Sequence, residues 1–101
     1  MTAQVGGYAF EGPYTSNDDL KDEPGLYAVV CQSAGNTFAL IDVGESAMVK
    51  KAVENHTRKE SWTSYCRTGQ AVAVFYTPDL QEAQRQSIEQ EIRKRMNPPC
   101  R

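Results

Sequence analysis

The sequence predicts an α+β fold with a small three-stranded, mainly antiparallel sheet flanked by helices. Two apolar runs, residues 26–32 and 37–43, are joined by the short segment 33–36, and a third apolar run covers residues 71–77. Short apolar runs bounded by turn residues are typical of strands. Segments with helical spacing follow the second and third runs. The predicted order is therefore strand, strand, helix, strand, helix.

The chain length predicts one domain with an N-terminal extension. A chain of 101 residues has the size of a single domain. Residues 1–24 are rich in Gly, Pro, Asp, Ser and Thr, which predicts turns anchored by Phe10, Tyr14 and Leu20. The folded domain is predicted to cover residues 25–101.

The first two strands are predicted to pair as a hairpin. The turn falls at residues 33–36, where Gly35 or Asn36 can adopt positive φ. A four-residue loop and a two-residue turn at Gly35-Asn36 give registers that differ by two residues. Because side chains alternate with period two, Tyr27 and Asp42 share one face in both registers.

Gly44 allows a sharp exit from the second strand, and Ser46 is the expected cap of the helix that follows. One face of this helix is predicted to be buried, at Met48, Val49, Ala52, Val53 and His56. Residues 57–69 are predicted to form a polar, partly irregular connection. The last helix is expected to begin near residues 77–79 and to end at Met96, before Asn97-Pro98-Pro99.

Charge and hydropathy limit the function classes. The net charge of −2 argues against strong nonspecific binding of nucleic acid, although basic residues cluster at 50–59 and 93–95. No apolar run reaches the roughly 18 residues that span a bilayer, and the N-terminus has no signal-peptide pattern. Cys31, Cys66 and Cys100 are an odd set without close spacing, which predicts free thiols in a reducing compartment. We therefore expect a cytoplasmic protein that does not bind membranes.

Several short motifs occur in a fixed order. Gly25-Leu26-Tyr27 opens the first strand, and Asp42-Val43-Gly44 closes the second. His56 lies 12 residues after Gly44, and Glu89 on the last helix is followed nine residues later by Pro98. In order and spacing, this pattern resembles the GIY-YIG nuclease superfamily, over about residues 25–101. The chain is interpreted as a divergent, degenerate member.

The resemblance implies phosphodiester hydrolysis with Mg²⁺ or Mn²⁺. It places Glu89 as the metal ligand and Tyr27 as a group that helps to deprotonate the attacking water. His56 stands where many members of the family carry a histidine, and Asp42 replaces the tyrosine of the second signature. The candidate catalytic residues are thus Tyr27, Asp42, His56 and Glu89. Asp42 is either a second metal ligand or a hydrogen-bonding group near the strand end.

The arginine that the family carries eight residues after the glycine is replaced by Ala52. Loss of a phosphate-facing cation can cost several orders of magnitude in phosphoryl transfer. Lys51, Arg58 or Arg101 are candidates to replace it. The predicted function is therefore a nuclease-like domain with weak or no cleavage that binds nucleic acid or a divalent metal. The alternatives are a non-catalytic protein-interaction module and an active metal-dependent DNA endonuclease, and the oligomeric state is open.

Structural interpretations compete with these roles. Arg85 and Arg93 lie four residues before and after Glu89, which is the spacing of a surface ion-pair line on a helix. His56 is alternatively a capping or packed histidine, and Trp62 is interpreted as a packing anchor.

Overall fold

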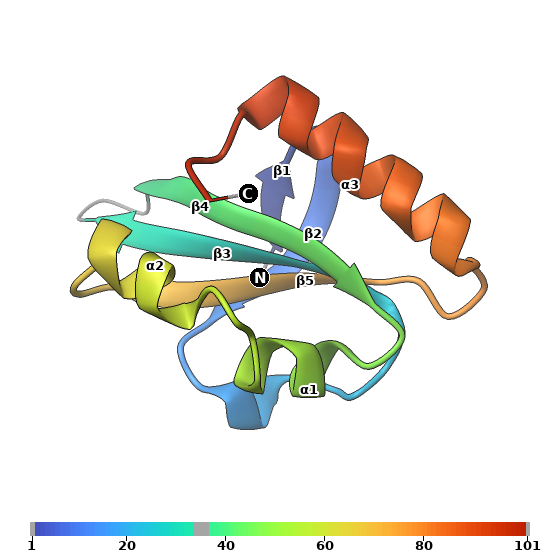
Figure 1. The fold of residues 1–101 in the computed structure, drawn as a ribbon, viewed down its shortest axis with the longest axis horizontal. Helices are drawn as coiled ribbons and strands as arrows, with labels where there is room; N and C mark the ends of the chain where they lie inside the picture. The colour runs from blue at the N-terminus through green and yellow to red at the C-terminus, as the bar shows by residue number, and fades with distance from the viewer. Residues whose placement is uncertain (1, 34–36, 101) are drawn as a thin grey trace.

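The main element of the computed structural model, which describes residues 2–33 and 37–100, is a curled antiparallel sheet (Figure 1). Its order is β1-β2-β5-β3-β4. The strands are β1 (Thr2–Val5), β2 (Tyr8–Tyr14), β3 (Gly25–Ser33), β4 (Thr37–Ser46) and β5 (Gln70–Tyr76). The helices are the 3₁₀ turn η1 (Asn17–Asp19), α1 (Val49–Glu54), α2 (Lys59–Tyr65) and α3 (Glu82–Met96). The predicted turn residues 34–36 lie outside the described part of the chain.

The prediction of a small three-stranded sheet is wrong, because the described sheet has five strands. The predicted strands form the β4-β3-β5 side, and the N-terminal segment adds β1 and β2. Gly6 and Gly7 have φ of 56° and 92° and form the turn of this hairpin. β2 pairs with the edge of β5 that β3 leaves free, through Glu11 opposite Val74. The glycines that suggested a loop are therefore the turn of a hairpin.

A bulge in β4 decides where Asp42 points. Val30 pairs with Leu40, whereas Val29 pairs with Asp42, so that Ile41 is an extra residue on β4. Tyr27 lies opposite Gly44. Asp42 is two residues before Gly44, the partner of Tyr27, and therefore lies on the same face of the hairpin as Tyr27. This confirms the predicted shared face.

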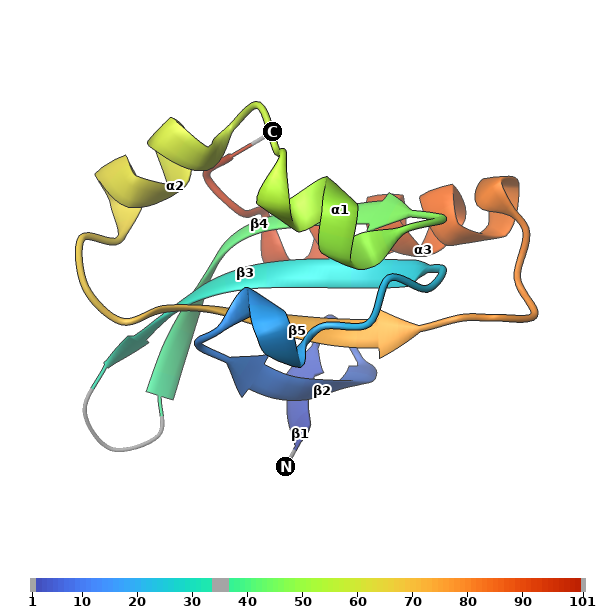
Figure 2. The same cartoon turned by 90° about the horizontal axis from the view of Figure 1, so that it is seen from below.

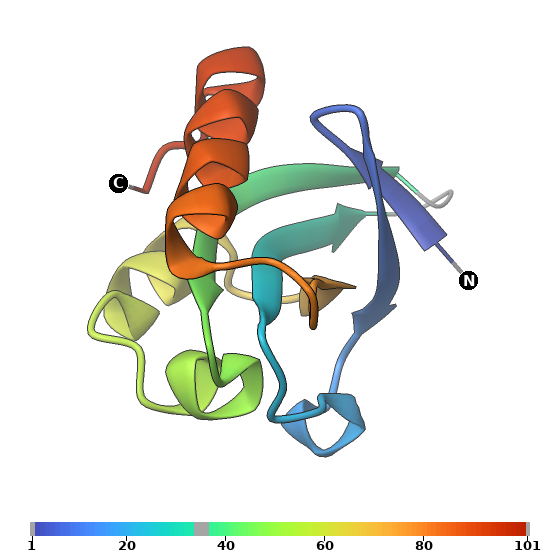
Figure 3. The same cartoon turned by 90° about the vertical axis from the view of Figure 1, so that its right-hand side faces the viewer.

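Each face of the sheet has its own core. Side chains of α1, α2 and the C-terminal segment cover one face, where the larger buried residues are Leu20, Tyr27, Val29, Ile41, Val49, Val53, Trp62, Val72 and Val74. Figure 2 shows α1 and α2 on this side of β3 and β4. The second core contains Val5, Phe10, Leu26, Ala28, Val43, Ala73 and Ile92. The sheet curves from β4 to β1 on the side where α3 packs (Figure 3).

The helices differ from the prediction in three places. The first helix has Met48 and not Ser46 as its N-cap, and Met48, which was predicted to be buried, is exposed. The connection that we expected to be irregular contains α2, which buries Trp62 against the sheet. The last helix begins at Glu82, because the Gln84 side chain accepts a hydrogen bond of 2.7 Å from the Gln81 N–H. Arg85 of α3 is buried and pairs with Glu45 of β4 at 2.9 Å. The expected surface line from Arg85 to Glu89 is therefore absent from the described contacts.

The prediction of three free thiols is also wrong. Cys31 of β3 and Cys66, which follows α2, form a disulfide with a Cα–Cα distance of 5.6 Å, although they are 35 residues apart. Cys100 is a free, buried thiol. The structural reason is that α2 packs against the sheet through Trp62, which bonds to Asp42 of β4, and so brings Cys66 beside Cys31; sequence spacing does not reveal this contact.

Candidate functional site

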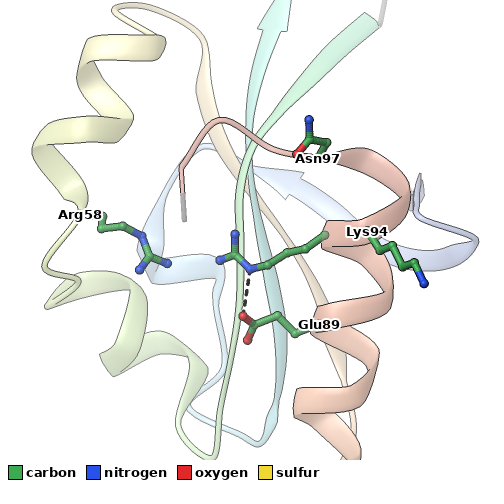
Figure 4. A pocket seen from close by; sticks show the side chains of 5 residues that line it. Arg58, Glu89, Lys94 and Asn97 are labelled. Carbon is green, nitrogen blue, oxygen red and sulfur yellow. Dashed lines mark hydrogen bonds and ion pairs between the residues drawn. The ribbon is translucent and has the colours of Figure 1, made fainter.

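A surface pocket of about 480 Å³ lies between the start of α2 and the second half of α3. Its lining is mainly basic and consists of Arg58, Arg93 and Lys94, one carboxylate, Glu89, and the amide side chain of Asn97. Figure 4 shows Arg58 and Glu89 reaching toward the middle of the pocket from opposite walls, whereas Lys94 extends away from them along α3. Two chain segments that are distant in sequence therefore form one basic pocket.

Asp42 lies behind the pocket and binds the two arginines that line it. Its side chain has no exposed surface. It accepts hydrogen bonds from Arg58 Nε at 2.9 Å, Arg93 Nη2 at 2.9 Å and Trp62 Nε1 at 2.8 Å. Burial alone would raise the pKa of Asp42, but the hydrogen bonds from Arg58, Trp62 and Arg93 hold that pKa below its ordinary value. Asp42 is therefore an ionised carboxylate that holds two guanidinium groups side by side.

Arg93 links α3 to the edge of the sheet. Its Nε donates to Glu89 at 3.0 Å, and its Nη1 donates to the Cys100 carbonyl at 2.8 Å. Its Nη2 donates both to Asp42 and to the Val43 carbonyl on the outer edge of β4. All three nitrogens are thus used in the structure. Arg93 supplies positive charge to the pocket while it holds the helix against β4.

Arg58 retains a free donor. Its Nε and Nη2 bond to the two oxygens of Asp42, at 2.9 and 3.3 Å. Within the described residues, Arg58 Nη1 has no hydrogen-bond partner, and 31% of the side chain is exposed. Arginine presents a planar set of donors that matches a carboxylate or phosphate group. The geometry thus leaves Arg58 able to contact a bound anion while Asp42 holds it in place.

An aromatic cluster lies beside Asp42. The rings of Tyr27 and His56 are 5.8 Å apart, and those of His56 and Trp62 are 4.6 Å apart. Burial and the charge of Asp42 raise the pKa of Tyr27 to about 12. Burial and the charge of Arg58 lower the pKa of His56, whose Nδ1 accepts the Arg58 N–H at 3.0 Å. At neutral pH Tyr27 is therefore a protonated donor and His56 is neutral.

The structure gathers all four candidate catalytic residues. Tyr27, Asp42 and His56 lie on one face of the sheet, and Arg93 connects Glu89 to Asp42. Asp42 has the role of a hydrogen-bonding group, since strong donors occupy both of its oxygens.

Among the cations considered as replacements for the arginine missing at Ala52, Arg58 reaches the pocket. Lys51 is exposed on α1 and is not in the lining of the pocket. Arg101 lies outside the described residues.

Sequence reasoning missed two members of the site. Arg93 was interpreted as half of an ion pair with Glu89, which the structure contains, and Trp62 as a packing residue, but neither was predicted to bind Asp42. Trp62 is indeed buried, but its indole N–H also binds Asp42. The available signal was Asp42 itself, because a carboxylate inside an apolar strand requires donors from elsewhere in the chain. A buried carboxylate in the sequence therefore indicates that donors are needed, but it does not identify the residues that supply them.

The donor set does not fit a divalent cation. Glu89 already accepts a hydrogen bond from Arg93, and Asp42 is saturated. Among the described residues, no group of three or more His, Cys, Asp or Glu side chains could hold a metal ion. Hard divalent cations need several oxygen ligands, whereas this pocket presents mainly positive groups. The arrangement therefore suits an anion better than a metal.

Comparisons of the chain with protein-family models, with curated proteins and with solved structures found no match. A search for membrane spans in the described part of the chain found no helix with the length and hydrophobicity that a crossing needs.

Proposed function

We propose that this chain is a divergent GIY-YIG-like domain that binds the phosphate groups of nucleic acid, with weak or no endonuclease activity. The observation that carries the proposal is the pair of guanidinium groups, Arg58 and Arg93, held on the buried carboxylate of Asp42. The carboxylates of Asp42 and Glu89 together balance these two charges, so that Lys94 leaves the cluster with one net positive charge. A phosphodiester oxygen is a suitable ligand for the remaining positive charge.

Three observations support weak or absent cleavage. A tyrosine with a pKa of about 12 holds its proton at neutral pH, so Tyr27 is a poor proton acceptor. Glu89, which the family resemblance places on the metal, is paired with Arg93. The helix position that carries an arginine in the family is Ala52, which brings no charge.

Binding is tested by fluorescence anisotropy with labelled 20-nucleotide single-stranded and duplex DNA. We expect a dissociation constant on the order of 10 µM at physiological salt, weakening as salt rises, as for nonspecific phosphate binding. Lys94→Glu reverses a charge in the pocket and should weaken binding at least fivefold. Lys51→Glu makes the same change on α1, outside the pocket lining, and should have a much smaller effect. Equal effects of the two substitutions, or no saturable binding, would overturn the proposal.

Glu89→Gln separates an anion site from a metal site. The variant keeps an oxygen acceptor for Arg93 but removes a negative charge, so DNA affinity should rise about threefold from the lost Coulomb repulsion. If Glu89 is instead the ligand of a catalytic metal, the substitution should remove an activity and not increase an affinity. In that case the wild-type protein cleaves DNA with Mg²⁺ or Mn²⁺, and Glu89→Gln abolishes cleavage.

A further inference from the structure

The disulfide and the pocket are connected through one short helix. Cys66 directly follows the last residue of α2, and Arg58 directly precedes the first. The bond to Cys31 fixes the C-terminal end of α2 to β3. At the other end Arg58 bonds to Asp42, and Trp62, in the middle of the helix, bonds to the same carboxylate. The helix that delivers one of the paired arginines is therefore covalently tied to the sheet.

The position of α2 depends on these two attachments. The helix has seven residues, and isolated helices of this length are not stable in water. Of its residues, Trp62 is the one that is buried. The disulfide lies one helical turn beyond Trp62, so that its loss leaves Trp62 as the one buried residue that holds the C-terminal half of α2 to the sheet.

The bond is open to chemical attack on one side. Cys31 is partly exposed, whereas Cys66 is 3% exposed. A dithiol reductant can therefore attack Cys31 Sγ, which forms a mixed disulfide and releases Cys66 as the thiolate. The second thiol of the reductant then displaces Cys31, which leaves two protein thiols and an oxidised reductant. The carbonyl oxygen of Thr68 lies 3.0 Å from Cys66 Sγ and 3.4 Å from Cys31 Sγ, where it can accept a hydrogen bond from a new thiol.

We infer that the Cys31–Cys66 disulfide regulates the phosphate pocket, and that its two-electron reduction by a dithiol weakens anion binding by releasing α2. This inference rests on the proposed function of the pocket. In the oxidised protein, α2 holds Arg58 against Asp42 and the pocket is complete. In the reduced protein, α2 moves away from the sheet at its C-terminal end, and the paired guanidinium groups lose their fixed spacing.

The experiment uses the full chain and the labelled single-stranded DNA, before and after treatment with dithiothreitol. Thiol titration under denaturing conditions should rise from one group, Cys100, to three. The dissociation constant should increase at least threefold on reduction and should recover on reoxidation. The double variant Cys31→Ser, Cys66→Ser should bind as weakly as the reduced protein and should not respond to dithiothreitol. The control Cys100→Ser should respond as the wild type does.

Trp62, the single tryptophan of the chain, reports on α2 directly. Its emission should shift to longer wavelength on reduction, while far-UV circular dichroism shows the sheet still folded. Equal affinity in the two redox states refutes regulation by the disulfide but does not contradict the proposed phosphate-binding site. Absence of binding by the oxidised protein refutes the site itself. Global unfolding of the reduced protein at the assay temperature also overturns the inference, because the loss would then not be local to α2.

Discussion

Replacing Asp42 by asparagine is the sharpest test of the proposed architecture. The substitution keeps the side-chain shape but leaves one oxygen, in place of two, for donors from Arg58, Arg93 and Trp62. Its new NH₂ group must face at least one guanidinium donor. Removing one partner of a buried ion pair costs about 3–5 kcal/mol. Because 31% of the Arg58 side chain and 20% of the Arg93 side chain are exposed, water can replace part of the lost interaction. We therefore expect a loss near the lower limit, about 3 kcal/mol.

Urea unfolding at pH 7, followed by Trp62 fluorescence, measures this loss as a lower midpoint at an unchanged slope. The matched control is Asp79→Asn, which makes the same chemical change at an exposed position and should stay within about 0.5 kcal/mol of wild type. A loss below about 1 kcal/mol for Asp42→Asn would refute the claim that one buried carboxylate organises the two arginines. Adding Arg58→Gln to both backgrounds then measures the coupling between the pair.

Three further predictions concern the neighbours of Asp42. A Cβ on Gly44 would lie 2.9 Å from Tyr27 Cε2 and closer still to Oη and Cζ, so Gly44→Ala should cost about 2–3 kcal/mol by urea unfolding. The folded-state pKa of His56 lies below its ordinary 6.5, through burial and the charge of a nearby guanidinium, so the unfolded chain takes up the proton first. Stability should then fall as the pH drops below 6.5, and thermal unfolding of His56→Gln should show less of this loss between about pH 7 and pH 5. Trp62→Phe keeps a buried ring but removes a donor to Asp42, and should cost about 1–2 kcal/mol by circular dichroism in urea.

Each of these predictions has an outcome that contradicts it. Wild-type stability in Gly44→Ala would mean that the Tyr27 ring does not lie over β4. A His56→Gln variant with the same acid loss as wild type would assign that loss to the carboxylates. An unchanged midpoint in Trp62→Phe would mean that the indole N–H contributes nothing to holding Asp42.

The local pattern of the sequence was sufficient for part of the fold. The apolar runs located β3, β4 and β5, and Pro98 with Pro99 marked the end of α3. Alternation of strand side chains predicted that Tyr27 and Asp42 share one face, but the strands leave the turn with Ser33 opposite Thr37, in neither predicted register, and the bulge at Ile41 is what returns Asp42 to the face of Tyr27. The absence of a side chain at Gly44 has a steric reason, since the Tyr27 ring occupies the space that a Cβ would take.

Other features had no local signal. The hairpin β1–β2 was hidden because Gly6 and Gly7 have the composition of a loop, and only pairing with the free edge of β5 makes them a strand turn. The short helix α2 lacks an amphipathic pattern that is long enough to detect. It is held by Trp62 and by the disulfide at Cys66.

The sequence by itself determined that a carboxylate stands at Asp42 in an apolar strand, on the same face as a tyrosine, in a chain with two clusters of basic residues at 50–59 and 93–95. The tertiary structure decided which cations reach it, because Arg58 is 16 residues away and Arg93 is 51 residues away. Burial requires that the charge of Asp42 be paired, and this requirement follows from its position in the strand. Which partners satisfy it depends on how α2 and α3 pack against β4, which long-range contacts determine.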